Sequence, residues 1–421
     1  MRRRFHTARA CSCRPWRAGG VPVNEIVRLA AKGDGVTASG QHVAFSVPGD
    51  TITADGGIER GDHHVDPACR HFAVCGGCQL QHADEQMLRA FVRDRVINAA
   101  RGQGVEVGEV LTEHLSPVQS RRRASLHALR TANGAVLGFR EAGSHRLVDL
   151  AECPVLRPEL TALIPAMREF VAKHGPKGNV DITLTLCDQG VDVGLSHFPL
   201  EGLAATEGTL DFARQHALAR LTIDQGYGPE TVWEPEPATV SLSGIPVALP
   251  AGAFLQATQD AEDLMVSDAR IALGDARIVA DLFAGLGTFA FGLARSGPEG
   301  RKVLAVEADQ SAHLACKASA ARSGGRVLTT HRDLFRNPLQ AEELSRFDGV
   351  LLDPPRAGAK AQISQLAKSD CPRTVYISCN PSSWARDAAV LCEAGYQLET
   401  LRPVGQFRWS THVELVSVFS R

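Results

Sequence analysis

The chain has 421 residues, of which 44% are hydrophobic, so it is long enough for two or three domains with a sizeable core. Its 45 basic and 47 acidic residues nearly balance, so the overall charge neither indicates nor excludes a nucleic-acid partner. No apolar run approaches the ~20 residues that a membrane-spanning helix needs, and no apolar signal segment is present. We therefore expect a cytoplasmic protein with no membrane partner.

Residues 1–23 are rich in arginine and contain no acidic side chain. They also lack an apolar stretch of the kind found in secretory signals. We expect a disordered extension here, with a transit-like presequence or an RNA-contacting arm as alternatives.

Residues 24–60 show alternating apolar positions interrupted by Gly-Asp-Gly, Ser-Gly and Pro-Gly-Asp, which are typical turn sequences. This pattern predicts a small β-barrel-like module. After a linker and a cysteine-rich segment, residues 84–100 carry apolar side chains at helical spacing and predict an amphipathic helix.

Eleven cysteines in a chain of this length are too few and too irregular for a disulfide scaffold. Three of them cluster in "CRHFAVCGGCQLQH", at positions 69, 75 and 78. This clustering indicates metal or cluster ligation in a reducing compartment, with a fourth ligand from elsewhere in the chain. Cys153 in "AECPVL" is a candidate because a Cys-Pro pair is frequent at cluster ligands. Zinc and an iron–sulfur cluster both remain open on spacing alone.

Residues 118–250 read as a strand-rich α/β region, with a hairpin around Asn133-Gly134. With the cysteine segment it forms a predicted central region over 67–245. Basic side chains are frequent here and are candidates for RNA contacts, although a solvated basic face is the alternative. They are Arg121, Arg122, Arg123, Arg130, Arg140 and Arg146.

From residue 246 to 421, short apolar runs alternate with helix-length segments, which predicts a doubly wound, mostly parallel sheet of Rossmann-like type. The last stretch has no helix between its strands, so we expect an antiparallel last strand. In such sheets ligands bind beyond the carboxyl ends of the strands. Those ends carry "DLFAGLGT", an acid at 307 and "LLDPPRAG", which together favour an adenosine-containing methyl donor.

Four motifs occur in order: "DLFAGLGTFAF", "LLDPPRAG", "YISCNP" and a terminal "HVE". Together they resemble the RNA uracil-C5 methyltransferases, a class I family that uses S-adenosylmethionine. The resemblance covers most of the chain from about residue 67, and the module at 24–60 resembles a TRAM domain. It implies a class I methyltransferase domain at 246–421.

The resemblance implies two catalytic residues. Carbon 5 of uracil is a poor nucleophile until a thiolate adds to carbon 6, and a base must later remove the carbon 5 proton. Cys379 matches the family's thiolate and Glu414 its general base. The family often has a Pro-His-Thr lead-in before that base, where this chain has "RWST" at 408–411.

Further site residues are implied in the same way. Those expected to contact S-adenosylmethionine are Gln256, Phe283, Thr288, Glu307, Asp333 and Asp353. The ribosomal-RNA members carry a [4Fe–4S] cluster with this cysteine layout, which favours iron–sulfur over zinc. Its implied ligands are Cys69, Cys75, Cys78 and Cys153.

The predicted substrate is RNA, with 23S ribosomal RNA favoured over transfer RNA because the tRNA branch generally lacks the cluster and the β module. We expect a monomer. Two alternatives stay open: a methyltransferase acting on an exocyclic amine, and a non-catalytic iron–sulfur RNA-binding protein. The first would need no Cys379, and the second would need neither the thiol nor the base.

Overall fold

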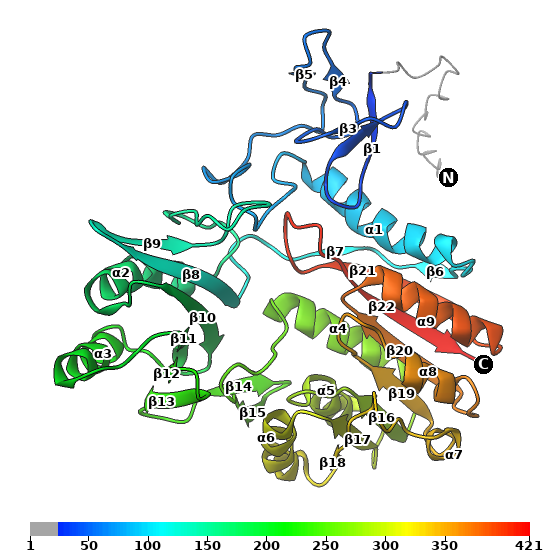
Figure 1. Cartoon of the computed structure of the whole chain (residues 1–421). Helices are drawn as coiled ribbons and strands as arrows, with labels where there is room; N and C mark the ends of the chain where they lie inside the picture. Colours follow the sequence, from blue (N-terminus) through cyan, green and yellow to red (C-terminus); the bar gives the residue numbers. More distant parts are fainter. Residues whose placement is uncertain (1–23) are drawn as a thin grey trace, which may run out of the picture.

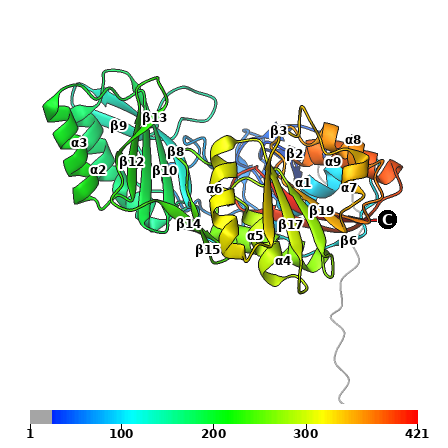
Figure 2. The same ribbon diagram turned by 90° about the horizontal axis from the view of Figure 1, so that it is seen from below.

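The structure, a computed structural model, describes residues 24–421, and the predicted extension at 1–23 lies outside them. Figure 1 shows a small N-terminal module above two larger lobes, and Figure 2 shows those lobes side by side, each built on one sheet. Within 24–421, no helix combines the length and the apolar character that crossing a bilayer requires.

The N-terminal module contains two small antiparallel sheets. One has the strand order β1–β2–β3 and the other is the hairpin of β4 and β5, and a bridge between Glu25 and Thr51 connects them. The predicted barrel at 24–60 therefore stays a prediction. The strands are β1 (Ile26–Leu29), β2 (Gly35–Thr37), β3 (His42–Val43), β4 (Thr51–Ile52) and β5 (Ile58–Glu59).

The predicted helix after the cysteine segment is confirmed as α1 (Glu85–Gly102). Asp84 caps its start, because the Asp84 carboxylate accepts a hydrogen bond of 2.8 Å from the Met87 backbone N–H. The apolar face of α1 packs on α9 and β21 of the C-terminal lobe. Two short strands that follow it, β6 (Glu109–Val110) and β7 (His114–Leu115), pair with β21.

The central lobe is a six-stranded sheet in the order β13–β12–β11–β10–β8–β9, with its apolar core between the sheet and helices α2 and α3. The predicted hairpin is present, with Thr131 paired to Gly134 across its turn. The elements are β8 (Arg123–Thr131), β9 (Gly134–Gly138), α2 (Pro158–His174), β10 (Asn179–Cys187), β11 (Gly190–Ser196), α3 (Leu203–Gln215), β12 (Arg220–Asp224) and β13 (Pro229–Trp233). A hairpin of β14 (Thr239–Leu242) and β15 (Ile245–Ala248) leads to the next lobe.

The C-terminal lobe is a sheet in the order β18–β17–β16–β19–β20–β22–β21, extended by β6. Its first five strands are parallel and β22 is antiparallel to both neighbours, which confirms the predicted mostly parallel sheet with an antiparallel last strand. The strands are β16 (Ile278–Leu282), β17 (Lys302–Glu307), β18 (Val327–His331), β19 (Gly349–Leu352), β20 (Arg373–Ser378), β21 (Gln397–Gly405) and β22 (Glu414–Ser420).

Helices cover both faces of this sheet. Successive residues of a strand point to opposite faces, so neighbouring apolar residues enter different cores. Leu351 belongs to the core under α4, α5 and α6, whereas Leu352 belongs to the core under α1, α8 and α9. This double cover explains the continuous apolar runs in the sequence. The helices are α4 (Gln259–Ala272), α5 (Thr288–Ser296), α6 (Gln310–Ala320), α7 (Ala341–Leu344), α8 (Lys360–Leu366) and α9 (Pro381–Glu393), with a 3₁₀ turn at Ala321–Ser323.

Candidate active site

The register of the parallel strands brings three predicted site residues to one level of the sheet. Leu282 is paired with Val306 on one side and with Leu352 on the other. The next residue of each strand is therefore Phe283, Glu307 or Asp353, and the three lie side by side at the carboxyl edge. This is the edge at which doubly wound sheets bind their ligands.

The glycine-rich turn after β16 is tightly built. Phe283 has a φ of +64° and Gly287 a φ of +92°, and Gly287 precedes Thr288 at the start of α5. A Cβ atom at 287 would lie 2.8 Å from the Cys316 sulfur and 2.7 Å from the Phe291 ring, so only glycine fits. The turn thus presents the N-terminus of α5 toward the strand ends.

The Glu307 carboxylate fixes this turn. Its Oε2 accepts a 2.7 Å hydrogen bond from the Gly285 N–H, and its Oε1 accepts bonds of 2.7 and 2.6 Å from the amides of Ala308 and Asp309. A carboxylate has about four lone-pair sites, so one stays open for a ligand hydroxyl. Acceptance of two hydroxyls from one ribose by Glu307 would thus require Gly285 to release its bond.

The Asp333 carboxylate accepts hydrogen bonds from the backbone of its own turn. Its Oδ1 accepts hydrogen bonds from the amides of Phe335 and Arg336, at 2.9 and 3.3 Å. Its Oδ2 lies 3.4 Å from the Arg336 guanidinium. Beside this turn, the half-exposed Phe335 ring lies 5.5 Å from the Phe283 ring, centroid to centroid. The ring pair is the apolar part of this end of the sheet.

Gln256 reaches the same edge from the loop before α4. The Gln256 Nε2 donates a 3.2 Å hydrogen bond to Oδ2 of Asp353. Burial raises the pKa of Asp353 well above its usual range, and the nearby carboxyls of Glu414 and Asp281 raise it further. Residues 97 positions apart in the sequence therefore meet at one carboxyl group.

Cys379 and Glu414 face each other across two antiparallel strands. Ser378 at the end of β20 is paired with Leu415 in β22. One step further along this register, Cys379 stands opposite Glu414. The predicted thiol and the predicted base are thus brought together although 35 residues of chain separate them, and both lie next to the end of β19, where Asp353 follows.

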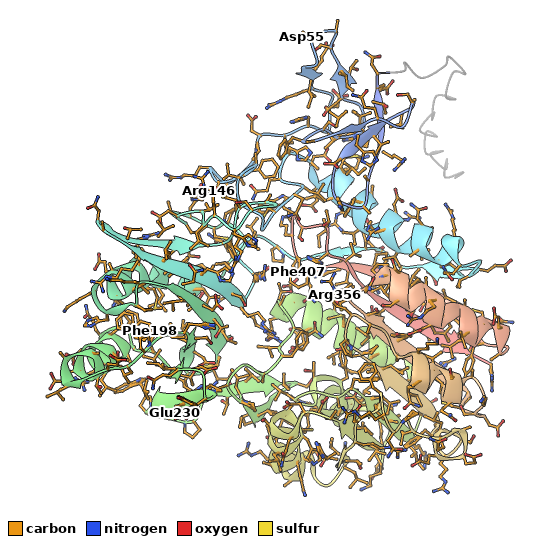
Figure 3. The ribbon with its side chains drawn as sticks, viewed as in Figure 1. Asp55, Arg146, Phe198, Glu230, Arg356 and Phe407 are labelled. Atoms are coloured by element: carbon orange, nitrogen blue, oxygen red, sulfur yellow. The ribbon has the colours of Figure 1, made fainter. Side chains whose placement is uncertain are left out.

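The loop that follows β19 is tied to the turn that holds the thiol. The Asn380 Nδ2 donates a 2.9 Å hydrogen bond to the carbonyl oxygen of Arg356, and the Ser383 hydroxyl donates to the same oxygen at 3.0 Å. Asn380 also caps α9 through its bond with the Ser382 N–H. Arg356 is held near Cys379 in this way, and Figure 3 shows it toward the middle of the molecule.

Burial dominates the electrostatics of the facing pair. Burial raises the pKa of the Cys379 thiol to about 11, with Glu414 and Asp353 adding to the rise and Arg356 opposing it. Burial also raises the pKa of Glu414 to about 7, against the opposing effects of the Gln406 amide and Arg356. A carboxyl with this pKa exchanges its proton near neutral pH, as a general base must.

Comparison with known proteins bears on this arrangement. The family model for tRNA (uracil-5-)-methyltransferases matches residues 248–421. An uncharacterized RNA methyltransferase of Zymomonas mobilis is 50% identical over 95% of this chain and all of its own length. The 23S rRNA (uracil(1939)-C(5))-methyltransferase of Erwinia tasmaniensis is 30% identical, over 85% of this chain and 82% of its own. The chain belongs to the RNA (uracil-5-)methyltransferase family.

The predicted family and enzyme class are therefore confirmed. The class I fold of this RNA (uracil-5-)methyltransferase is confirmed as well. The crystal structure of the Pyrococcus abyssi tRNA (uracil-54, C5)-methyltransferase in complex with S-adenosyl-L-homocysteine superimposes with a TM-score of 0.72, at 22% identity, over 94% of this chain and 99% of that one.

A second site of the methyltransferase is a cavity lined by all four predicted cluster ligands. Cys69, Cys75 and Cys78 come from the segment before α1, and Cys153 comes from the loop before α2. Burial raises the pKa of each thiol, that of Cys78 to about 12. Within residues 24–421, no three His, Cys, Asp or Glu side chains are placed so that they could bind one metal ion.

The arginine run before β8 makes several contacts within the protein, so its assignment to an RNA face stays a prediction. Arg122 is buried and forms a 2.5 Å ion pair with Glu262 of α4. Arg123 donates to the Leu255 carbonyl oxygen, and Arg121 lines the cysteine cavity. Arg122 and Arg123 thereby join the two lobes. Arg121, Arg123 and Arg140 are half-buried, whereas Arg130 and Arg146 are exposed.

Two further residues lie at the site but were not among the predicted site residues. Gln406 is buried, donates a hydrogen bond to Gln256 and favours the charged form of Glu414. Asp281 of β16 is fully buried, and neither of its carboxylate oxygens has a hydrogen-bond partner in the described part of the chain. Burial raises the pKa of Asp281 to about 8. Asp281 opens the motif "DLFAGLGT", whereas Gln406 becomes visible only when distant segments are placed in space.

Proposed function

We propose that this enzyme transfers a methyl group from S-adenosylmethionine to carbon 5 of a uridine in 23S ribosomal RNA, through a covalent adduct between Cys379 and carbon 6. The observation that carries the proposal is the position of Cys379 opposite Glu414 at the carboxyl edge of the sheet. Methylation of an exocyclic amine would use neither side chain, and a non-catalytic RNA-binding protein would have no use for a buried carboxyl with a pKa of about 7.

The chemistry assigns each step to one of these groups. The Cys379 thiolate adds to carbon 6, and the electrons of the 5,6 double bond move to oxygen 4 as an enolate. Carbon 5 of the enolate then bonds the methyl group, and S-adenosylhomocysteine leaves as a neutral thioether. Glu414 removes the carbon 5 proton, the double bond re-forms, and the Cys379 thiolate departs.

The raised pKa of Cys379 means that the thiol must lose its proton when the substrates are in place. Binding of the methyl donor would favour this loss of a proton, because its sulfonium and ammonium groups are cations and the site has three buried acids, Asp281, Asp353 and Glu414. Opposite charge lowers the pKa of neighbouring acids. We therefore infer that donor binding precedes attack by Cys379.

Six residues are proposed to hold the donor: Gln256, Phe283, Thr288, Glu307, Asp333 and Asp353. Alignment of Phe283, Glu307 and Asp353 at one level of the sheet supports their part of this assignment. The bond between Gln256 and Asp353 supports a further part. Asp333 has the least direct support, since its own turn already uses its carboxylate.

We also propose that Cys69, Cys75, Cys78 and Cys153 hold a [4Fe–4S] cluster. The proposal is supported by the four thiols that line one cavity and by the half-buried Arg121 guanidinium beside them, which would offset the negative charge of thiolates. Each iron of such a cluster takes one cysteine, so the thiols need not surround a single ion. Such a cluster would brace the segment before α1 against the central lobe. The methyl transfer itself moves no electrons to or from it.

The RNA is proposed to lie along the central lobe and the N-terminal module. A hollow between the cysteine segment and the open face of the central sheet is lined by Arg140, His127 and His145. The proposed domains are a TRAM-like module at 24–60, an iron–sulfur and RNA-binding region at 67–245 and the methyltransferase domain at 246–421. The target uridine must leave its stack to reach Cys379.

The choice of 23S ribosomal RNA rests on the Erwinia relative, which aligns over most of its length, and on the cysteine-lined cavity. The test is nucleoside mapping of 23S ribosomal RNA and transfer RNA from a strain lacking this chain. We expect one 5-methyluridine to vanish from 23S ribosomal RNA and to return with the wild-type protein. Loss from transfer RNA instead would overturn the substrate, and no loss from either RNA would overturn the function.

A further inference from the structure

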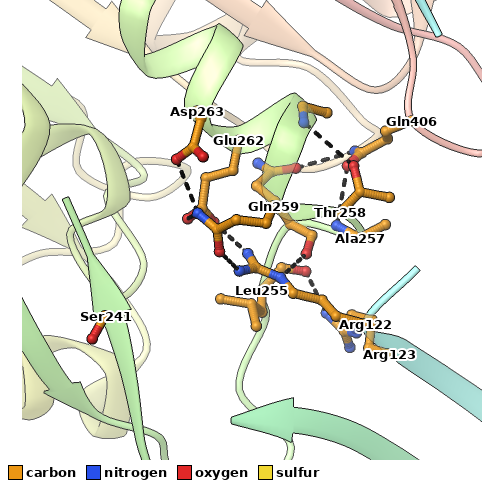
Figure 4. A network of polar contacts seen from close by, with 12 residues as sticks. Arg122, Arg123, Ser241, Leu255, Ala257, Thr258, Gln259, Glu262, Asp263 and Gln406 are labelled. Carbon is orange, nitrogen blue, oxygen red and sulfur yellow. Dashed lines mark hydrogen bonds and ion pairs between the residues drawn. The ribbon is translucent and has the colours of Figure 1, made fainter. Parts of the chain in front are cut away.

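Gln406 lies between the two halves of the candidate active site. It follows β21 and begins the loop 406–413, which ends at Glu414, and its side chain is only 2% exposed. Figure 4 shows the Gln406 amide beside the segment that carries Ala257, Thr258 and Gln259. None of the family motifs in the sequence includes this residue, so its contacts have to explain why a polar amide is buried here.

The orientation of the Gln406 amide is determined by the backbone. The Ala257 N–H donates a 3.0 Å hydrogen bond to Gln406, and a backbone N–H can only donate. The Gln406 oxygen must therefore face Ala257, which turns its NH₂ group toward the Gln256 oxygen, 3.1 Å away. The Gln256 NH₂ group is then left to donate to Asp353.

These bonds have one direction, from Ala257 through Gln406 and Gln256 to Asp353. If Gln406 could not donate, the Gln256 oxygen would lose its buried partner, and nothing would prevent that amide from rotating by half a turn. A rotated Gln256 would present its oxygen to Asp353 and its NH₂ group to position 406, so the donated hydrogen bond to Asp353 would be lost. Gln406 thereby fixes the orientation of the Gln256 side chain, which lies in a distant segment of the chain.

Gln406 also lies near Glu414, because it follows β21, in which Val404 is paired with Glu414, and its amide favours the charged form of that carboxyl. The titratable and charged groups that face Glu414 from the neighbouring elements are Asp353, Cys379 and Arg356. Asp353 and Cys379 bring no positive charge to it. Gln406 and Arg356 are thus the two groups that favour the Glu414 carboxylate, and Gln406 is the buried one.

We propose that Gln406 is a positioning residue that holds the Gln256 amide in its working orientation and at the same time stabilises the carboxylate of Glu414. The inference rests on the proposed function for the roles of Gln256 and Glu414. It adds that the donor-binding side and the proton-abstracting side of the site are coupled through one buried amide. A change at Gln406 should therefore affect donor affinity and proton transfer together.

Gln406→Met tests the coupling, because methionine is similar in size and has no N–H group. We expect S-adenosylmethionine, measured by calorimetry, to bind about tenfold more weakly, since a buried oxygen of Gln256 is left without a partner. In a Gln256→Met background the same change should alter the donor Kd by less than about twofold. An unchanged Kd, or an equal loss in both backgrounds, would overturn the proposal.

The pH dependence of single-turnover methylation gives a second readout that a loss of stability alone would not move. The rate should rise with pH as Glu414 loses its proton, with a midpoint near its pKa of about 7. Gln406→Met removes an amide that favours the carboxylate, so this midpoint should move to higher pH. A midpoint at the wild-type pH would contradict the effect of Gln406 on Glu414.

Gln362→Met is the matched control. Gln362 of α8 is equally buried, and its amide bridges the N–H and the carbonyl oxygen of Leu339, outside the active site. It should lose stability but keep the wild-type donor Kd and pH midpoint. If Gln406→Met does not fold, Gln406→Leu serves instead, because leucine also lacks the N–H donor. Normal 5-methyluridine formation with an unaltered donor Kd in that variant would refute the inference while leaving the proposed function intact.

Discussion

Glu414 shows how a single residue combines a functional gain with a cost in stability. Its carboxyl is buried between β20 and β21, and burial raises its pKa from 4.5 to about 7. The shift puts its protonation equilibrium where a base is needed. It also means that the folded protein binds a proton at Glu414 more tightly than the unfolded chain does.

The consequence for stability has a definite sign. Below pH 4.5 the carboxyl is protonated in both the folded and the unfolded state, so its ionisation does not affect the free energy of unfolding. Above pH 7 it is charged in both states, and the burial of this charge lowers the free energy of unfolding. Glu414→Gln imitates the protonated form. We expect it to raise the free energy of unfolding relative to wild type at pH 8, by at most about 3 kcal/mol, and to change it little at pH 4. Urea unfolding at both pH values measures this.

The matched control is Glu106→Gln in the exposed loop after α1, which should change stability by less than about 0.5 kcal/mol at either pH. An equal effect of Glu414→Gln at pH 4 and pH 8 would show that Glu414 does not titrate in the way described.

At the scale of elements, the turn between β16 and α5 is the part of the site that tolerates substitution least. Gly287 combines a left-handed backbone with contacts that would clash with any side chain. We expect Gly287→Ala to weaken binding of S-adenosylmethionine by at least about tenfold, because the turn must move away from the strand ends. Calorimetric titration of the purified variant measures the loss.

Gly324→Ala separates the clash from backbone strain alone. Gly324 has a similar φ of +66°, but no heavy atom lies within 4 Å of a Cβ placed there. It should lose some stability and bind the donor normally. Equal donor affinities for the Gly287 and Gly324 variants would mean that the turn is not part of the donor site.

Elements with a repeating pattern were predictable from sequence, and irregular ones were not. The parallel strands and α1 follow from apolar spacing, and strand ends indicate which motifs meet at the edge. Strands β6 and β7 have two residues each and carry no period that could be recognised. The burial of Arg122 could not be predicted, because local charge does not reveal which side chains are turned toward a partner lobe.

At the scale of the whole molecule, side-chain contacts join the central lobe to the C-terminal lobe. Arg122 pairs with Glu262 and donates to the Gln256 carbonyl oxygen, and His114 lies 2.7 Å from Asp260 in the same helix start. The loop 406–413 contacts the cysteine cavity at Phe407 and ends at Glu414. The segment that carries Gln256 is therefore braced from both lobes, so the donor site depends on their assembly. Gln406 could not be recognised from sequence for this reason.

The central claim is the transient bond between the Cys379 sulfur and carbon 6 of the target uridine. The most direct measurement is the intact mass of the protein after incubation with donor and with substrate RNA that contains 5-fluorouridine. Fluorine replaces the proton that Glu414 would remove, so the adduct cannot resolve. We predict a covalent protein–RNA species for wild type and none for Cys379→Ala. A wild-type enzyme that methylates ordinary RNA yet forms no such species, or an adduct that persists in Cys379→Ala, would contradict the account.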